Sequence, residues 1–302
     1  MTRPWHYTWK LTKQTFQEFS EDRPLDYAAI IGFYTIFSLP AVLIIIIRIA
    51  GAVFGHDAVR GQVVRQISGL VGNDSAEQIQ SIIQNASTSS ASTLGTILGV
   101  GTMLFTATTV FVALQDALNA MWDVKAKPGK AWLSLVISRV LSLAMVVSMG
   151  FLLLVSLSVE VILGALNEFL QQQFTGVAVY LMNAGNLLFS VLISIAIFAT
   201  IYKVLPDAKI RWTNVWVGAT VTAILFVIGK YVLNIYLRYE PLGETYGAAG
   251  SVILLIVWVY YTSVVFLLGA EFTQVYSREH DKRVEPTDHA VKVETREIEK
   301  ED

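Results

Sequence analysis

Ionisable and amide side chains inside long apolar stretches are the residues of this sequence with the greatest potential for chemistry. A charged group at the depth of a lipid bilayer costs free energy, so each one is a candidate for a functional role. We predict eight residues as candidates for lining a substrate cavity: Arg48, Asp116, Asn119, Arg139, Glu160, Lys230, Asn234 and Glu271.

Helix rise and chain direction place the charged candidates in two layers. The layer toward the outer side contains Arg48, Glu160 and Lys230. The layer toward the inner side contains Asp116, Arg139 and Glu271. Because each layer holds both signs, we expect ion pairs within a layer to offset the cost of burial. The expected pairs are Glu160 with Arg48 or Lys230, and Arg139 with Asp116 or Glu271.

Two interpretations of these layers remain open. In the first, the charges are interfacial, or they form structural pairs that fix helix register. In the second, a polar cavity between helices holds an anionic head group or solute near Arg139, or the outer layer gates it. Further amides could line such a cavity, namely Gln115, Asn183 and Asn186. Asn234 lies four residues after Lys230 and therefore shares its helical face.

The elements that must position these residues are long apolar helices. The 302 residues are 54% hydrophobic and 15% charged, and the mean hydropathy is +0.55. Crossing a bilayer takes about 20 apolar residues per helix. Because the apolar runs are continuous, they predict helices and not strands. We predict an all-α integral membrane protein, a bundle of six transmembrane helices with spans at 27–54, 94–118, 132–165, 177–205, 213–237 and 247–275.

Positive charge sets the expected orientation, because Lys and Arg concentrate in cytoplasmic loops. Basic residues cluster in the N-terminal segment, in the second and fourth connections (Lys125 to Lys130, and Lys203 to Arg211) and in the C-terminal segment. The opposite side has only Arg60, Arg65 and Arg238. We therefore predict a multi-pass membrane protein with both termini in the cytoplasm.

The segments outside the spans divide into three parts. Residues 1–26 predict a cytoplasmic amphipathic helix in the head-group region, and the spacing in the outer loop over 55–91 predicts short amphipathic helices. The polar residues 277–302 predict a disordered cytoplasmic tail outside the transmembrane domain of residues 27–276. Gly95 and Gly99 predict close helix packing in the second span, and oligomerisation through that face is possible.

Several classes of function lack their motifs. Cysteine is absent, and the four histidines are scattered without paired spacing, so we expect no metal site. The chain has no Gly-rich Lys-Ser/Thr loop for ATP, and no basic groove interleaved with aromatic residues for nucleic acid. We expect a protein that is not an enzyme and needs no cofactor, and whose partners are the lipid bilayer and a lipid head group or small solute.

Four segments resemble a known family: YAAIIGFYTIFSLPAVLIIII (27–47), FVALQDALNAMW (111–122), YKVLPDAKIRWTNVWVGA (202–219) and YGAAGSVILLIVWVYYTSVVFLLGAEF (246–272). Over residues 10–278 the chain resembles the YihY/BrkB family of bacterial inner-membrane proteins, also labelled ribonuclease BN-like, and the tail lies outside the resemblance. The positions that match the family pattern are Asn119, Pro206, Asp207, Gly218, Tyr246, Gly247, Trp258, Gly269 and Glu271. The resemblance implies a six-helix, multi-pass protein of the bacterial inner (cytoplasmic) membrane and no catalytic motif.

Three functions fit these sequence features to different degrees. The first is a transporter or flippase-like protein for an envelope lipid or small solute, without its own ATPase. The second is a scaffold or envelope-integrity protein that does not transport. A ribonuclease fits worst, because these residues supply no metal-ligand cluster and almost no soluble domain.

Overall fold

The computed structural model describes residues 4–55, 60–61, 64, 68, 77, 80–81, 93–127, 136–137, 139–148, 151–152, 177–239, 250–281 and 284–293. Most of the predicted outer loop at 55–91, and much of the predicted third span at 132–165, lie outside the described residues. Glu160 also lies outside them.

Long helices make up most of the described chain. They are α1 (Pro4–Glu21), α2 (Pro24–Phe54), α5 (Thr93–Met121), α7 (Val177–Val204), α8 (Trp212–Tyr239) and α10 (Gly250–Asp281). Four of them contain segments long and apolar enough to cross a membrane: Pro24–Arg48, Gly99–Met121, Trp212–Val232 and Val252–His280. Shorter apolar helices cover Arg139–Ser148 and Leu188–Val204. A mostly helical protein with several membrane-spanning helices is thus confirmed, while six spans with both ends inside stay a prediction.

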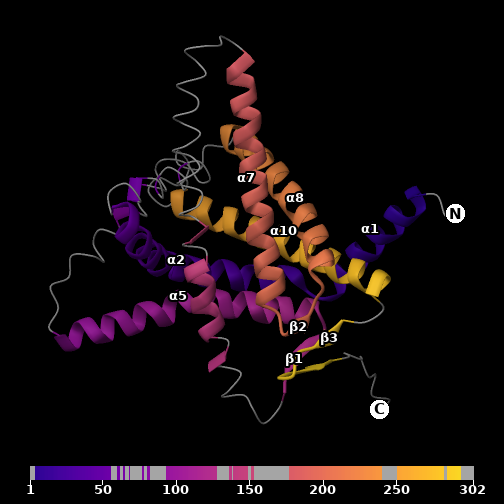
Figure 1. The fold of residues 1–302 in the computed structure, drawn as a ribbon, viewed down its shortest axis with the longest axis horizontal. Helices are drawn as coiled ribbons and strands as arrows, with labels where there is room; N and C mark the ends of the chain where they lie inside the picture. The colour runs from indigo at the N-terminus through magenta and orange to yellow at the C-terminus, as the bar shows by residue number, and fades with distance from the viewer. Residues whose placement is uncertain are drawn as a thin grey trace.

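Helix α10 organises the bundle, because it packs against α1, α2, α5 and α8. Helices α2 and α5 pack on each other, and α7 and α8 form a second pair that stands steeply across them (Figure 1). Large apolar side chains such as Phe33, Phe37 and Phe105 are more than half exposed. That outward-facing apolar surface suits lipid as the surrounding solvent.

The junction between α1 and α2 turns at Arg23, which has a left-handed backbone with φ of 51°. Pro24 follows at the start of α2, where its missing N–H costs no helical hydrogen bond. The predicted N-terminal helix is confirmed as α1. Its Leu11 and Thr15 are buried, whereas Trp9 is 64% exposed, so one face packs on the bundle and another is free for the head-group region.

Helices α8 and α10 meet through a glycine followed four residues later by a threonine, a pattern that is present on both helices. Gly218 and Thr222 on α8 face Thr273 and Gly269 on α10. Each threonine hydroxyl donates to the carbonyl of the glycine one turn earlier on its own helix, at 2.8 Å for Thr222 and 2.6 Å for Thr273. Each hydroxyl thereby occupies the space beside the glycine of the other helix, so the backbones approach closely.

The predicted close contact at Gly95 and Gly99 is not found in the described part of the chain. A Cβ added at Gly99 would have nothing within 4 Å, and the same holds for Gly101. The close packing lies instead at the α8 and α10 pattern. The use of the Gly95 and Gly99 face by a second copy stays a prediction.

Short strands tie the C-terminal segment to two interhelical connections (Figure 1). Strand β1 (Val124–Ala126) pairs antiparallel with β4 (Ala290–Lys292), and β2 (Ala208–Lys209) pairs with β3 (Glu285–Pro286). The mostly helical fold thus includes four short strands among the described residues, and one expectation is corrected: residues 284–293 of the predicted disordered tail are ordered. The reason is that the backbones after α5 and α7 offer hydrogen bonds that the polar tail can complete.

Replacing Gly269 by Ala tests the α8 and α10 contact. The added Cβ would lie 1.8 Å from Thr222 Oγ1 and 2.9 Å from Thr222 Cβ, so the free energy of unfolding should fall by about 1 to 3 kcal/mol. Gly32→Ala on α2 is the matched control, since its Cβ would meet nothing within 4 Å. Thermal unfolding in detergent should rank Gly269→Ala well below Gly32→Ala; equal melting temperatures would contradict the tight contact.

Candidate functional site

A cavity of about 800 Å³ lies where the α1 and α2 junction meets the end of α5 and the turn after α7. Helix α5 contributes Gln115, Asp116, Asn119 and Ala120 to its lining. The remaining lining residues are Glu21, Asp22, Arg23, Asp26, Tyr27, Ile30, Asp123, Val124, Lys125, Asp207 and Val293. The cavity is at the end of the bundle capped by strands, which the charge pattern predicts as cytoplasmic.

The lining of this cavity is strongly acidic, with six carboxylates against two cationic side chains. One of the cations, Arg23, already forms an ion pair with Asp26. Asp116 is exposed to the cavity and makes no hydrogen bond or ion pair with the described residues. An excess of unpaired negative charge in a concave site attracts cations.

Asn119 and Asp207 form a clamp between α5 and the turn before β2. The Asn119 amide donates to Asp207 Oδ2 at 2.9 Å, and the Asp207 backbone N–H donates back to Asn119 Oδ1 at 2.7 Å. Gln115 Nε2 donates to Asp207 Oδ1 at 3.3 Å, and Gln115 Oε1 is buried without a hydrogen-bond partner in the described part. The clamp fixes the turn after α7 against α5 at the cavity and leaves Gln115 Oε1 without a donor.

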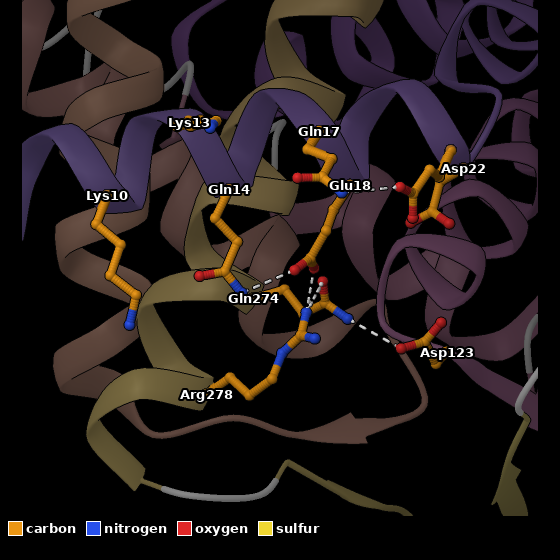
Figure 2. A pocket seen from close by; sticks show the side chains of 10 residues that line it. Lys10, Lys13, Gln14, Gln17, Glu18, Asp22, Asp123, Gln274 and Arg278 are labelled. Carbon is orange, nitrogen blue, oxygen red and sulfur yellow. Dashed lines mark hydrogen bonds and ion pairs between the residues drawn. The ribbon is translucent and has the colours of Figure 1, made fainter.

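A second cavity of about 570 Å³ adjoins the first and shares Glu21, Asp22 and Asp123 with it. Figure 2 shows Gln14 and Glu18 of α1 facing Gln274 and Arg278 of α10 across it. Arg278 donates to Glu18 and, at 3.2 Å, to Gln274 Oε1. Gln274 Nε2 in turn donates to Asp123 Oδ2 at 3.2 Å.

The two shared aspartates have perturbed pKa values. Burial raises the pKa of Asp22 from 3.8 to about 6, and the negative charge of Asp123 adds to the shift. Burial also raises the pKa of Asp123, although Lys292 and Arg278 act in the opposite direction. These carboxyl groups therefore bind protons more readily than ordinary surface aspartates.

Glu271 is a predicted candidate that the fold buries completely. Its side chain is 0% exposed, and neither carboxylate oxygen has a hydrogen-bond donor among the described residues. Glu271 lies two residues from Gly269 and two from Thr273, so it is on the face of α10 opposite to the contact with α8. Asp22 is its carboxyl neighbour across the junction of α1 and α2.

The predicted ion pair of Arg139 with Asp116 or Glu271 is not formed. Its Nη1 donates to the Phe105 carbonyl at 3.1 Å and to the Thr108 hydroxyl at 2.9 Å. Its guanidinium carbon also lies 4.2 Å from the centre of the Phe105 ring. The threonine-rich face of α5 thus satisfies Arg139, which takes no part in lining the acidic cavity.

The remaining predicted residues lie apart from this cavity. Arg48 is exposed on α2, and Lys230 is half-buried on α8. Asn234 lies on α8, but its side chain is outside the described part, as are those of Asn183 and Asn186. Of the eight candidates, the structure brings Asp116 and Asn119 together in the cavity and places Glu271 beside Asp22, which lines it.

Sequence reasoning missed the acidic residues at helix ends, because they lie outside the apolar runs and carry no cost of burial in lipid. These are Glu18, Glu21, Asp22, Asp26 and Asp123. One signal for the turn between α1 and α2 was available in the sequence. The proline at position 24 disfavours helical backbone at the residue before it, Arg23. Within the described residues, no group of three or more His, Cys, Asp or Glu side chains has a geometry that could hold a metal ion.

The fold and cavity define a multi-pass helical membrane protein with a polar site at one end of the bundle. The family model for virulence factor BrkB matches residues 15–294, and the chain belongs to this family. The match includes the strands β3 and β4, so the family region extends beyond the residue 278 at which the resemblance was expected to end.

Relatives are named as membrane proteins. A UPF0761 membrane protein of Aeromonas salmonicida (strain A449) is 27% identical over 263 residues, covering 85% of this chain and 86% of its own. One of Verminephrobacter eiseniae (strain EF01-2) is 29% identical over 277 residues, and this chain spans 62% of its length. One of Legionella pneumophila (strain Corby) is 31% identical over 206 residues, with 47% of its length spanned. No solved structure matches.

Replacing Asn119 by Ala tests the clamp. The substitution removes two hydrogen bonds and leaves the Asp207 N–H without its acceptor, so the free energy of unfolding should fall by about 1 to 3 kcal/mol. Gln17→Ala is the control, because the Gln17 amide is exposed and donates only to Glu21 one turn away. Thermal unfolding should separate the two variants; a neutral Asn119→Ala would contradict a structural role for the clamp.

Proposed function

We propose that the protein moves a small solute or an envelope lipid across the bacterial inner membrane, without an ATPase of its own. The observation that carries the proposal is the acidic cavity of about 800 Å³ at the end of a membrane-spanning bundle. Its volume falls within the range of ligand-binding pockets, about 300 to 1,000 Å³.

The charge of the cavity favours a substrate with a cationic group. Arg139, around which an anionic head group was expected, is satisfied by α5. The exposed carboxylate of Asp116 instead offers a negative charge to a cationic group bound in the cavity. Both a free organic cation and the amine of a phospholipid head group have this chemistry.

The scaffold alternative receives less support from the C-terminal segment. Residues 284–293 are engaged in the chain's own strands and in hydrogen bonds such as Thr287 N to Asp207 O at 2.9 Å. A segment bound in this way has few free backbone groups with which to recruit a partner.

Flux in proteoliposomes tests the proposal. Radiolabelled choline represents a free cation, and phospholipids with a fluorescent tail and either an ethanolamine or a glycerol head group represent the lipid arm. We expect faster movement of one ammonium-bearing probe than in protein-free vesicles, and little movement of the anionic glycerol lipid. Asp116→Lys should slow that movement by about tenfold or more, the factor that corresponds to about 1.4 kcal/mol of lost binding.

Asp288→Asn is the matched control, because Asp288 is an exposed carboxylate on the same end of the protein that pairs with Lys209 at 3.0 Å. It should leave flux unchanged. Equal flux in vesicles with and without protein for every probe would refute the proposal and favour a scaffold. Faster movement of the glycerol lipid alone would refute the cationic substrate.

A further inference from the structure

A buried carboxyl group without a hydrogen-bond donor needs a proton or a counter-ion. Glu271 is 0% exposed, and both of its oxygens lack a donor within the described residues. An ionised carboxylate in that position would be neither hydrated nor paired, a state that costs several kcal/mol. A proton on Glu271 removes the charge and supplies a donor.

The candidate acceptor for that donor is Asp22, whose charge acts on Glu271 and on which the Glu271 carboxyl group acts in turn. Two carboxyl groups are both acceptors when ionised, so they can hydrogen-bond to each other only if one of them is protonated. The arrangement therefore favours one proton shared by the pair, which titrates as a unit.

The surrounding charges reinforce this preference. Glu18 and Glu21 of α1 and Asp123 after α5 add negative charge near the pair. Arg278 of α10 is the cation acting on Glu271, and it is already bound to Glu18. Lys292 of β4 acts on Asp123. Arg278 is thus engaged with Glu18, Arg23 beside Asp22 is paired with Asp26, and Lys13 and Lys125 are further cations that line the two cavities.

Position gives the pair a route to water. Asp22 is partly exposed and lines both cavities, whereas Glu271 lies behind it on a membrane-spanning helix. A proton can therefore enter from a cavity through Asp22 and reach a site that lipid and protein shield. Because Asp22 also lines the proposed cation site, a proton on the pair lowers the negative charge that the substrate meets.

We propose that Asp22 and Glu271 form a carboxyl pair that binds one exchangeable proton, and that this proton competes with a cationic substrate and couples to its transport. The second half of the proposal rests on the proposed function, and the first half does not. Competition for binding is reciprocal: the substrate weakens proton binding by the same factor by which the proton weakens substrate binding.

Infrared difference spectroscopy of the full chain in lipid nanodiscs tests the proton site directly. The wild-type protein should show the carbonyl band of a protonated carboxyl group that is lost as pH rises. Glu271→Gln should abolish that band, whereas Asp22→Asn should keep it and change the pH at which it is lost. Glu279→Gln is the control, since Glu279 lies on the same helix but is exposed and paired with Lys10 at 2.8 Å. A band that persists in Glu271→Gln, or no band in the wild type, would overturn the proton site.

Stability against pH gives a second readout. The pKa of Asp22 is raised from 3.8 to about 6 on folding, so the folded protein binds more protons than the unfolded chain between about pH 4 and pH 6. The contribution of this group to stability is therefore present at low pH and falls as pH rises through that window. Asp22→Asn should flatten this part of the melting curve against pH, and Glu279→Gln should leave it; an unchanged slope in Asp22→Asn would count against the pair.

Coupling is tested with radiolabelled choline, whose permanent charge prevents trapping by a pH difference. In proteoliposomes choline should accumulate in the more acidic compartment, by up to about tenfold per pH unit for one proton exchanged per cation. Glu271→Gln should abolish this dependence on the pH difference. If the infrared band behaves as expected but no probe moves, the proton site stands and the proposed function fails. If choline moves without regard to pH, the function stands and the coupling fails.

Discussion

The close contact between α8 and α10 is the constraint on which the rest of the structure depends. Gly218 and Gly269 carry no side chain at the crossing, so the hydroxyls of Thr273 and Thr222 fill the space between the two backbones. In lipid, where apolar side chains gain little by leaving their surroundings, such close backbone packing is a main source of helix association. Tyr202 of α7 joins the same junction, since its hydroxyl donates to the Phe266 carbonyl of α10 at 2.6 Å.

This contact also orients the chemistry of α10. Gly269 and Thr273 pack on α8, so Glu271, two residues from each, lies on the opposite face of the helix, where its carboxyl group is buried. One turn further along Gln274 contacts Asp123, and two turns further along Arg278 contacts Glu18, both at the polar cavities. A single helix thus carries a buried acid and a hydrated polar network within three turns, and any movement of α10 changes both.

The sequence predicted the described helices well and the polar end of the bundle poorly. Long apolar runs identify membrane helices because lipid leaves the backbone no other way to satisfy its hydrogen bonds. Asp116, Asn119 and Glu271 stood out because they interrupt such runs. The acidic residues at Asp22 and Asp123 could not be found in this way, since polar residues at helix ends are ordinary, and only the fold brings these two together.

The strands β3 and β4 were missed for a similar reason: two or three residues pair through backbone groups whose partners lie more than 70 residues away.

Arg139 and Glu271 illustrate why charge pairing across a membrane bundle cannot be assigned by depth alone. Both were placed in one layer, and opposite charges at one depth seemed to predict a pair. Arg139 instead finds three oxygen acceptors on α5, where Thr108 and Thr109 offer hydroxyls beside the Phe105 carbonyl. A guanidinium group can be satisfied by neutral acceptors, whereas a carboxylate needs donors, and an apolar helix interface offers few. The acid is therefore the group left without a partner, and a proton is the smallest ligand that can resolve its burial.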